Sequence, residues 1–460
     1  MLVILGFLMV AAFMFLILTK RATPVVALIL VPVIFGLFAG AGLGIGDMIT
    51  DGIKSLAPTA ALLFFAIIFF GIMIDVGLFD PLVRGILRLV RNDPMRLVVG
   101  TAVLAMVVSL DGDGSTTFII VTSALLPLYL KLGVSPVILT VVAGLANGTM
   151  NIIPWGGPTV RAASALGISP SEVFVPMVPS LVAGLVIVLL FSVHLGLMER
   201  RRLGSLVFDQ EMVSVGGGGS DTGRPARRTG GGAGGDADGG AGQFIDGLDP
   251  QRDTLRPKLL WFNAALTVVL LVVLVMDILP IPVLFMIAAS IALTVNFPKV
   301  KEQGEAIARH SASIVSVVAM VLAAAVLTGV FSGTGMVEAM AEWLLGVIPS
   351  SMGPFLAVIT GVLSIPLTFF MTNDAFYFGI LPVLTETAAQ YGIEPVEMAR
   401  ASITGQPVHL QSPLVPAILL LVTLAGVSLA DHHKKVLWRA TVVSLAMLAV
   451  GVLLGQIPMG

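Results

Sequence analysis

The chain has 460 residues, of which 57% are hydrophobic and only 11% are charged, and its mean hydropathy is +1.03. This composition excludes a soluble globular protein and predicts an all-α polytopic protein of the cell membrane that crosses the lipid bilayer several times. The formal net charge of −2 argues against a nucleic-acid partner, and the lack of cysteine excludes disulfides, thiolate metal sites and cysteine nucleophiles.

The first apolar segment, residues 1–19, has no basic residues before it and no small-residue cleavage site after it. It therefore predicts a retained span rather than a signal peptide.

The stretch "SLDGDGSTTFII", residues 109–120, places two aspartates in apolar surroundings. About 34 mostly apolar residues separate Arg96 from Lys131, too few for two full spans of about 20 residues with a turn. The stretch predicts a re-entrant hairpin whose tip is Asp111 to Thr117, with glycines that permit a tight turn. Non-helical backbone at that depth is tolerated only where it lines a cavity or is buried in protein.

The next apolar segment, residues 144–164, contains Pro154, Gly156, Gly157 and Pro158. Because proline removes a helical hydrogen bond, this density of proline and glycine predicts a broken helix.

Residues 206–256 are rich in glycine and polar side chains and show no periodicity. They predict a flexible cytoplasmic linker that separates a first transmembrane repeat, residues 1–205, from a second repeat, residues 257–460.

The second half repeats both features. Residues 353–390 carry "FFMTNDAFYF" in their middle and no Lys or Arg, which favours a hairpin that enters from the outside. Residues 402–421 contain Pro407, Pro413 and Pro416 and predict a second broken helix.

Landmark residues of the two halves recur at a nearly constant spacing. Pro24, Gly71 and Gly77 precede Pro282, Gly329 and Gly335 by 258 residues, while Gly133 and Pro154 precede Gly392 and Pro413 by 259. Duplicated halves in a membrane protein indicate a transporter.

Basic residues mark the cytoplasmic side of a membrane protein. If all the basic clusters at the span ends lie inside, the first half begins outside and the second begins inside, so the repeats are inverted. Those clusters comprise Lys20, Arg21, Arg84, Arg88, Arg91, Arg96, Lys131, Arg200 to Arg202, Arg256, Lys258, Lys299, Lys301, Lys434 and Lys435.

The two hairpin tips and the two broken helices are expected to meet near the middle of the membrane. Half-helix N-termini present free N–H groups to anions, and carbonyl-bearing ends suit cations. The arrangement predicts one site that takes an anion together with a cation.

The motifs "DGDGSTTFIIVTSALLPLY", "NGTMNIIPWGGPTVRAAS" and "ITGQPVHLQSPLVPA" resemble the citrate-metal:proton symporter family, within the ion transporter superfamily that includes the dicarboxylate/sodium symporters. The resemblance covers essentially the whole chain outside the linker. It implies uptake of citrate complexed with a divalent metal, magnesium or calcium, driven by protons, by a homodimer with elevator-type movement. The tips depart from the Ser-Asn-Thr of the dicarboxylate branch, which puts sodium coupling and plain dicarboxylate substrates in doubt.

The acidic candidates are Asp111, Asp113 and Asp374. Each is interpreted as a ligand of the incoming metal or a carrier of the coupling proton, because a buried charge is costly without such a partner. The alternative is structural, since a carboxylate also caps the N–H groups of a half-helix.

Arg161 and Arg400 are the arginines of the broken segments, and a guanidinium is a natural partner of a substrate carboxylate. Arg161 is the preferred candidate, because Arg400 could instead extend to the membrane interface. His409 is a candidate proton carrier, although a packing role that donates to a carbonyl is equally open.

The remaining candidates are hydroxyl and amide side chains for substrate binding. The hydroxyls could instead bond to their own backbone. The amides stand where the helices unwind, positions that line cation and substrate sites in the superfamily the chain resembles. This set comprises Ser115, Thr116, Asn147, Asn151, Thr372, Asn373, Gln406, Gln411 and Ser412.

Two other functions are compatible with parts of the sequence. One is a carrier for another di- or tricarboxylate or organic anion, coupled to sodium or protons. The other is an intramembrane aspartyl protease, in which two carboxylates share a proton. The protease leaves the duplication unexplained, and cleavage of peptides by the purified protein would decide it.

Overall fold

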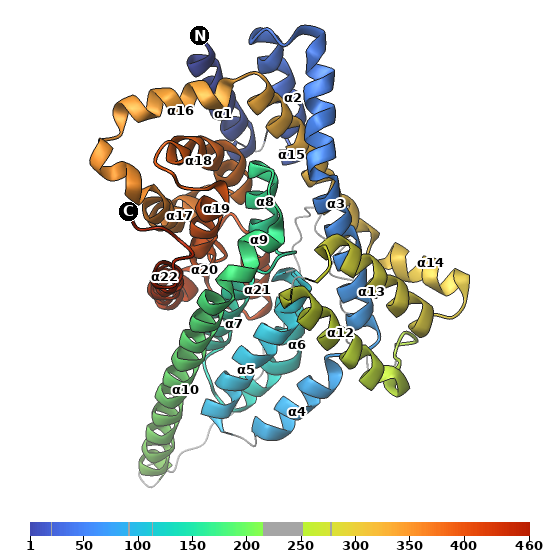
Figure 1. Cartoon of the computed structure of the whole chain (residues 1–460). Helices are drawn as coiled ribbons and strands as arrows, with labels where there is room; N and C mark the ends of the chain where they lie inside the picture. Colours follow the sequence, from blue (N-terminus) through green and yellow to red (C-terminus); the bar gives the residue numbers. More distant parts are fainter. Residues whose placement is uncertain (20, 91–92, 113, 215–251, 277) are drawn as a thin grey trace.

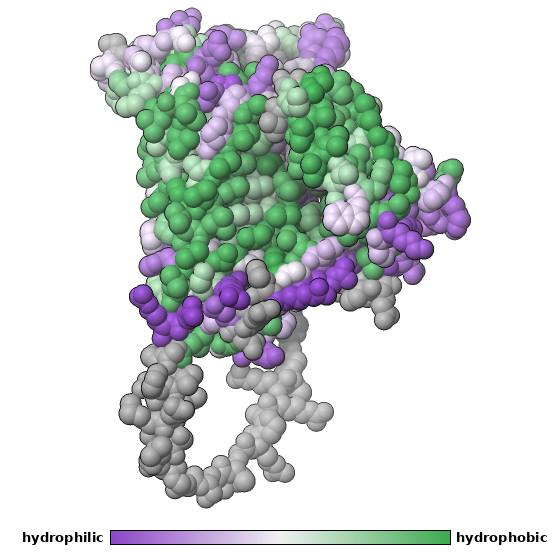
Figure 2. Space-filling view, turned by 60° about the horizontal axis from the view of Figure 1, so that its bottom comes forward, coloured by the Kyte–Doolittle hydropathy of each residue, from purple (hydrophilic) through white to green (hydrophobic). Residues whose placement is uncertain are grey.

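The computed structural model describes residues 1–19, 21–90, 93–112, 114–214, 252–276 and 278–460. These residues form helices and no β-strand, which confirms the predicted all-helical fold. Eight helical stretches in the described part of the chain are long and apolar enough to cross a membrane. A broad hydrophobic band lies between hydrophilic ends on the face seen in Figure 2. The protein is a multi-pass membrane protein.

The first half, blue to green in Figure 1, ends in the long helix α10. Its helices are α1 (Leu2–Leu18), α2 (Pro24–Phe38), α3 (Ile45–Asp75), α4 (Asp80–Val90), α5 (Pro94–Val108), α6 (Gly114–Lys131), α7 (Pro136–Met150), α8 (Gly157–Leu166), α9 (Pro170–Phe174) and α10 (Val178–Ser214). Proline occupies the first turn of several of them, where its missing N–H has no intrahelical partner to lose. At α5, the side chain of Asp93 also accepts a hydrogen bond from the backbone N–H of Met95.

The second half is coloured yellow to red in Figure 1. Its elements are α12 (Leu260–Val275), α13 (Ile281–Asn296), α14 (Val300–Arg309), α15 (Ser311–Gly333), α16 (Met336–Val347), α17 (Leu356–Phe370), a π-helix (Ala375–Ile380), α18 (Leu381–Ala389), α19 (Pro395–Ser402), α20 (Gln406–His409), α21 (Pro416–Leu424) and α22 (Leu429–Leu453).

The element bounds recur at the spacing of the landmark residues. Helix α3 ends at Asp75 and α15 at Gly333, and both are followed by a glycine with positive φ, Gly77 at 87° and Gly335 at 72°. Helix α7 ends at Met150, and α20 ends 259 residues later at His409. Helix α8 begins at Gly157, and α21 begins 259 residues later at Pro416. The inversion of the halves across the membrane stays a prediction.

Helices α3 and α15 approach each other so closely that their backbones touch. A Cβ added at Gly52 would lie 2.2 Å from the carbonyl oxygen of Ala325, and one added at Gly329 would lie 2.2 Å from that of Met48. Small residues allow such approach between membrane helices, where dispersion contacts rather than hydrophobic burial drive association.

The predicted linker differs from the structure at both ends. Helix α10 continues to Ser214, nine residues past the predicted boundary at 206, because residues 206–214 contain neither glycine nor proline to end it. At the other end, Arg252 and Thr254 donate to the carbonyl oxygen of Asp75 at 2.9 and 2.8 Å, and so attach the chain to the end of α3. Residues 215–251, the centre of the predicted linker, lie outside the described residues.

Candidate functional site

The first predicted hairpin is formed by α5 and α6, which pack against each other. They are joined by a 3-10 turn, Ser109–Asp111, and by Gly112 at φ 81°. Trp155 Nε1 donates to the carbonyl oxygen of Leu110 at 2.7 Å, so the indole holds the turn against the first broken helix. Asp113 lies outside the described residues. That the hairpin re-enters the membrane from one side stays a prediction, since each arm is also long enough to cross it.

The second predicted tip lies between α17 and the π-helix. The hydroxyl of Thr372 accepts a hydrogen bond from the backbone N–H of Ala375 at 3.2 Å and so caps the start of the helix. Asp374 directly precedes the π-helix, and its side chain is buried. A π-helical turn widens the backbone locally and is frequent at functional sites.

Both predicted helix breaks are present. Helix stops at Met150 and restarts at Gly157 in the first half, and stops at His409 and restarts at Pro416 in the second. Side chains satisfy carbonyl groups near the breaks: Thr159 Oγ1 donates to Ile152 O at 2.7 Å, and Ser412 Oγ donates to Phe369 O at 2.6 Å. The second bond ties the break to the end of α17.

Two amide side chains at equivalent positions, Asn147 and Gln406, connect each hairpin tip to the helix that precedes the break. Asn147 Nδ2 donates to Ser109 Oγ at 2.8 Å. Gln406 Nε2 lies 3.2 Å from Asn373 Oδ1 and 2.9 Å from the Tyr377 hydroxyl. Asn147 and Gln406 are 259 positions apart, so each half connects its hairpin tip to the following helix through an amide side chain at the equivalent position.

Asn151 joins the two halves to each other. Its Nδ2 donates to Gln406 Oε1 at 3.3 Å, although 255 residues separate them in the sequence. The non-helical backbone of the first break is thereby held against α20 of the second half.

Arg161 and Asp374 form an ion pair across the two halves. Arg161 Nε, on α8, donates to Asp374 Oδ1 at 2.5 Å. The Asp374 side chain is 9% exposed and that of Arg161 is 27% exposed. A buried carboxylate of this kind requires a charged partner, and the pair fixes the orientation of the guanidinium.

A cavity of about 970 Å³ lies beside this pair. Four predicted site residues line it: Asp111, Ser115, Thr116 and Arg161. Trp155 and Phe378 add aromatic surface to the same wall, and a second wall comes from α3 and the first half of α15. The volume is near the upper end of the range for small-molecule sites and exceeds what one citrate needs.

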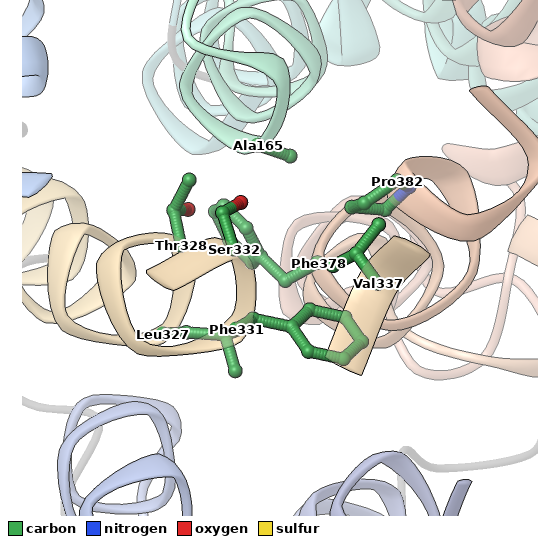
Figure 3. A pocket seen from close by; sticks show the side chains of 8 residues that line it. All are labelled: Ala165, Leu327, Thr328, Phe331, Ser332, Val337, Phe378 and Pro382. Atoms are coloured by element: carbon green, nitrogen blue, oxygen red, sulfur yellow. The ribbon is translucent and has the colours of Figure 1, made fainter. Parts of the chain in front are cut away.

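Helix α15 continues beyond the residues that line this cavity. Beyond the cavity-lining residues 312–321, the next turns pack against α8, α16 and the second hairpin and leave a pocket of only about 10 Å³. Figure 3 shows Phe331 of α15 directed to the side on which Val337, Phe378 and Pro382 lie, with Ala165 of α8 above them; Leu327, Thr328 and Ser332 of α15 also line this pocket. The same helix therefore lines a large cavity near its start and a closely packed contact near its end.

The other predicted residues lie behind the cavity wall. His409 Nδ1 is 2.6 Å from the carbonyl oxygen of Thr368, so this nitrogen carries the proton and Nε2 the lone pair. Gln411 Nε2 donates to the carbonyl oxygens of Gly144 and Pro407, and its Oε1 lies 3.1 Å from His432 Nε2. Arg400 instead donates to the carbonyl oxygen of Glu172 at 2.9 Å, away from the cavity.

The described residues contain no group of three His, Cys, Asp or Glu side chains placed to hold a metal ion. Asp374 is committed to Arg161, and Asp111 lies at the cavity wall.

Sequence reasoning missed several residues of the cavity. Asp75, Arg309 and His310 form a charged cluster in its second wall, and Arg252 approaches them from the end of the linker. An aspartate at the end of the apolar run "FFGIMID" is the signal that could have indicated it, because an acidic residue there requires a partner.

Comparison with known proteins agrees with this architecture. Residues 13–405 match the family described as "Citrate transporter". The chain belongs to the citrate transporter family. Family membership makes it a transporter and not an enzyme, which removes the protease alternative.

Two similar proteins come from Bacillus subtilis (strain 168). A protein named "Citrate transporter" is 47% identical over 458 residues, covering 99% of this chain and 100% of the relative. A "Mg(2+)/citrate complex secondary transporter" is 46% identical, covering 99% of both chains. Among solved structures, the Alcanivorax borkumensis YdaH transporter is similar in fold, with a TM-score of 0.57 at 12% identity, over 90% of this chain and 88% of that one.

Proposed function

We propose that this transporter is a secondary carrier that imports citrate complexed with a divalent metal ion, magnesium or calcium, coupled to protons. The observation that carries the proposal is the Arg161–Asp374 pair beside a cavity lined by Asp111, Ser115 and Thr116. It presents one oriented guanidinium and several oxygen groups to a space large enough for the complex. The similarity to a magnesium–citrate transporter supports the same substrate.

Charge favours the complex over free citrate. Citrate near pH 7 carries about three negative charges, whereas its complex with a divalent ion carries about one. Asp374 pairs with Arg161, and Asp111 places a further carboxylate at the same wall. Two like charges about 6 Å apart interact by roughly 3 kcal/mol at an effective dielectric near 20, enough to disfavour the trianion at the Arg161 site.

The metal is cargo, and citrate supplies most of its ligands. Magnesium and calcium prefer oxygen ligands, and Asp111 could complete the oxygen shell while Ser115 and Thr116 donate to citrate carboxylates. Asp113, in the same tip, is a further proposed ligand. Arg161 is proposed to bind a free carboxylate of the complex through the nitrogens that Asp374 does not occupy.

The coupling proton has its candidates in Asp111, Asp113, Asp374 and His409. Since His409 donates its Nδ1 proton to a carbonyl, its Nε2 lone pair is the position that could accept another. Asp374 is paired with Arg161 here, so it becomes available for the proton only in a state of the transport cycle in which that pair is broken.

Movement is proposed to follow an elevator mechanism within a homodimer. The contrast along α15, with an open cavity at residues 312–321 and a packed contact at 327–332, supports a state open to one side only. In the opposite state, α8 and the hairpins would shift along α15 and open the packed end.

The test is uptake of radiolabelled citrate into proteoliposomes. Magnesium or calcium should be required, and an acid-outside gradient should accelerate uptake in sodium-free buffer. Strict dependence on sodium, or uptake undiminished without divalent metal, would favour the alternative of a sodium-coupled or free-anion carrier.

A further inference from the structure

A second charged cluster lines the cavity away from the Arg161–Asp374 pair. Asp75, at the end of α3, accepts on Oδ2 from Arg309 Nε at 3.0 Å and lies 3.2 Å from His310 Nε2. Arg252 donates to Asp80 at 3.1 Å and to the carbonyl oxygen of Asp75 at 2.9 Å. All except Asp80 line the cavity.

Asp75 and Phe297 fix the position of Arg309, but not all of its N–H groups have a hydrogen-bond partner among the described residues. Its Nε bonds to Asp75 and its guanidinium lies over the ring of Phe297, 5.6 Å from the ring centre. Nη2 is enclosed and has no hydrogen-bond partner among the described residues. A buried donor without an acceptor is unfavourable, so the position calls for an oxygen atom that the described protein does not supply.

His310 is positioned by the same close packing. Gly71 of α3 lies directly under its ring, where a Cβ would approach the imidazole to 2.7 Å. His310 is also the residue before α15, a 23-residue helix whose first turn, including Ala312 and Ser313, lines the cavity. The positive end of that helix dipole adds to the guanidinium at this wall.

Acidic side chains balance the formal charges of Arg252 and Arg309, so this wall has no net positive charge. Arg252 is matched by Asp80, and Asp75 occupies Arg309 Nε and faces His310, while Asp253 also lines the cavity and is exposed. The terminal nitrogens of Arg309 remain the fork that a planar carboxylate would match.

We propose that Arg309, His310 and the first turn of α15 form a second carboxylate-binding site, which holds one carboxylate of the substrate in the cavity apart from the Arg161 site. This inference rests on the proposed function only for the choice of citrate as the carboxylate. A site built on a guanidinium and a helix start needs no metal, so metal-free citrate should bind here even where the Arg161 site requires the complex.

The natural absence of cysteine provides the test. Ser313→Cys places one thiol in the first turn of α15, in the cavity that Arg309 also lines, and its labelling by a maleimide is followed in purified protein with increasing metal-free citrate. Citrate should slow the labelling. Arg309→Gln, and Arg309→Lys, which keeps the ion pair with Asp75 but lacks the fork, should each raise the half-protecting citrate concentration about tenfold, as expected for loss of a charge-assisted hydrogen bond.

The matched control is Arg256→Gln. Arg256 lies over the same Phe297 ring at 5.2 Å but does not line the cavity, so it should leave protection unchanged. Equal protection in all three variants overturns the site, and so does an equal loss in all three, because the effect would then not belong to Arg309. Absence of citrate uptake by the unmodified protein would contradict the proposed function instead, while the protection result would still decide the carboxylate site.

Discussion

The Arg161–Asp374 pair yields the sharpest prediction, because one contact joins α8 to the second hairpin. Replacing Asp374 by Asn keeps the shape and removes the charge. At about 4 Å between charge centres and an effective dielectric near 20, the attraction is about 4 kcal/mol. Because Arg161 is 27% exposed, water screens part of this attraction. We therefore expect Asp374→Asn to lower the free energy of unfolding by about 2–3 kcal/mol, through an unpaired buried charge.

Arg161→Gln should destabilise by a similar amount, and the double variant Arg161→Gln with Asp374→Asn should regain most of the loss, since no unpaired charge remains. Transport should respond differently. All variants that lack Arg161 should lose about a hundredfold in citrate uptake at low substrate, the value of a bidentate guanidinium–carboxylate contact of about 3 kcal/mol.

The assays are thermal or denaturant unfolding of the purified protein and initial rates of citrate uptake in proteoliposomes. Arg400→Gln is the control, since that guanidinium bonds to a backbone carbonyl away from the cavity and its loss should spare uptake. If the double variant recovered transport along with stability, the pair would be purely structural and Arg161 would not bind substrate.

Four further predictions concern the substrate, coupling, packing and topology. Removal of divalent metal at constant total citrate should abolish uptake, and full-rate uptake with succinate competing as well as citrate would contradict a metal complex as cargo. A protonophore should remove the acceleration produced by an acid-outside gradient; an unaffected rate would exclude protons as the driving ion. Gly52→Ala should destabilise by about 1–3 kcal/mol, because its Cβ would meet a backbone carbonyl of α15 at 2.2 Å, whereas Gly46→Ala, with open space around it, should be neutral in the same unfolding measurement. Single cysteines near Lys131 and Gly353 should react with impermeant thiol reagents from opposite sides of the membrane, and labelling from one side would disprove the inverted repeat.

Features that arise from local physics could be predicted from the sequence. Its apolar composition required helices that satisfy their own backbone hydrogen bonds in lipid. Proline and glycine near Pro154 and Pro413 placed the two helix breaks, since a missing N–H and a flexible backbone act where they stand. The spacing of the landmark glycines, such as Gly77 and Gly335, agrees with helix ends because each adopts a positive φ that other residues rarely take.

Which polar side chains meet depends on how the helices pack and could not be predicted from the sequence. Arg161 and Asp374 are 213 residues apart, and Asn151 and Gln406 are 255 apart. No periodicity relates such residues, because their contact depends on how α8, the π-helix and α20 pack in three dimensions. The cluster around Asp75 depends in the same way on α14 and the end of the linker reaching α3. A polar residue in an apolar helix signals that it needs a partner, but the partner's identity is set by the neighbouring helix that packing brings within hydrogen-bond distance.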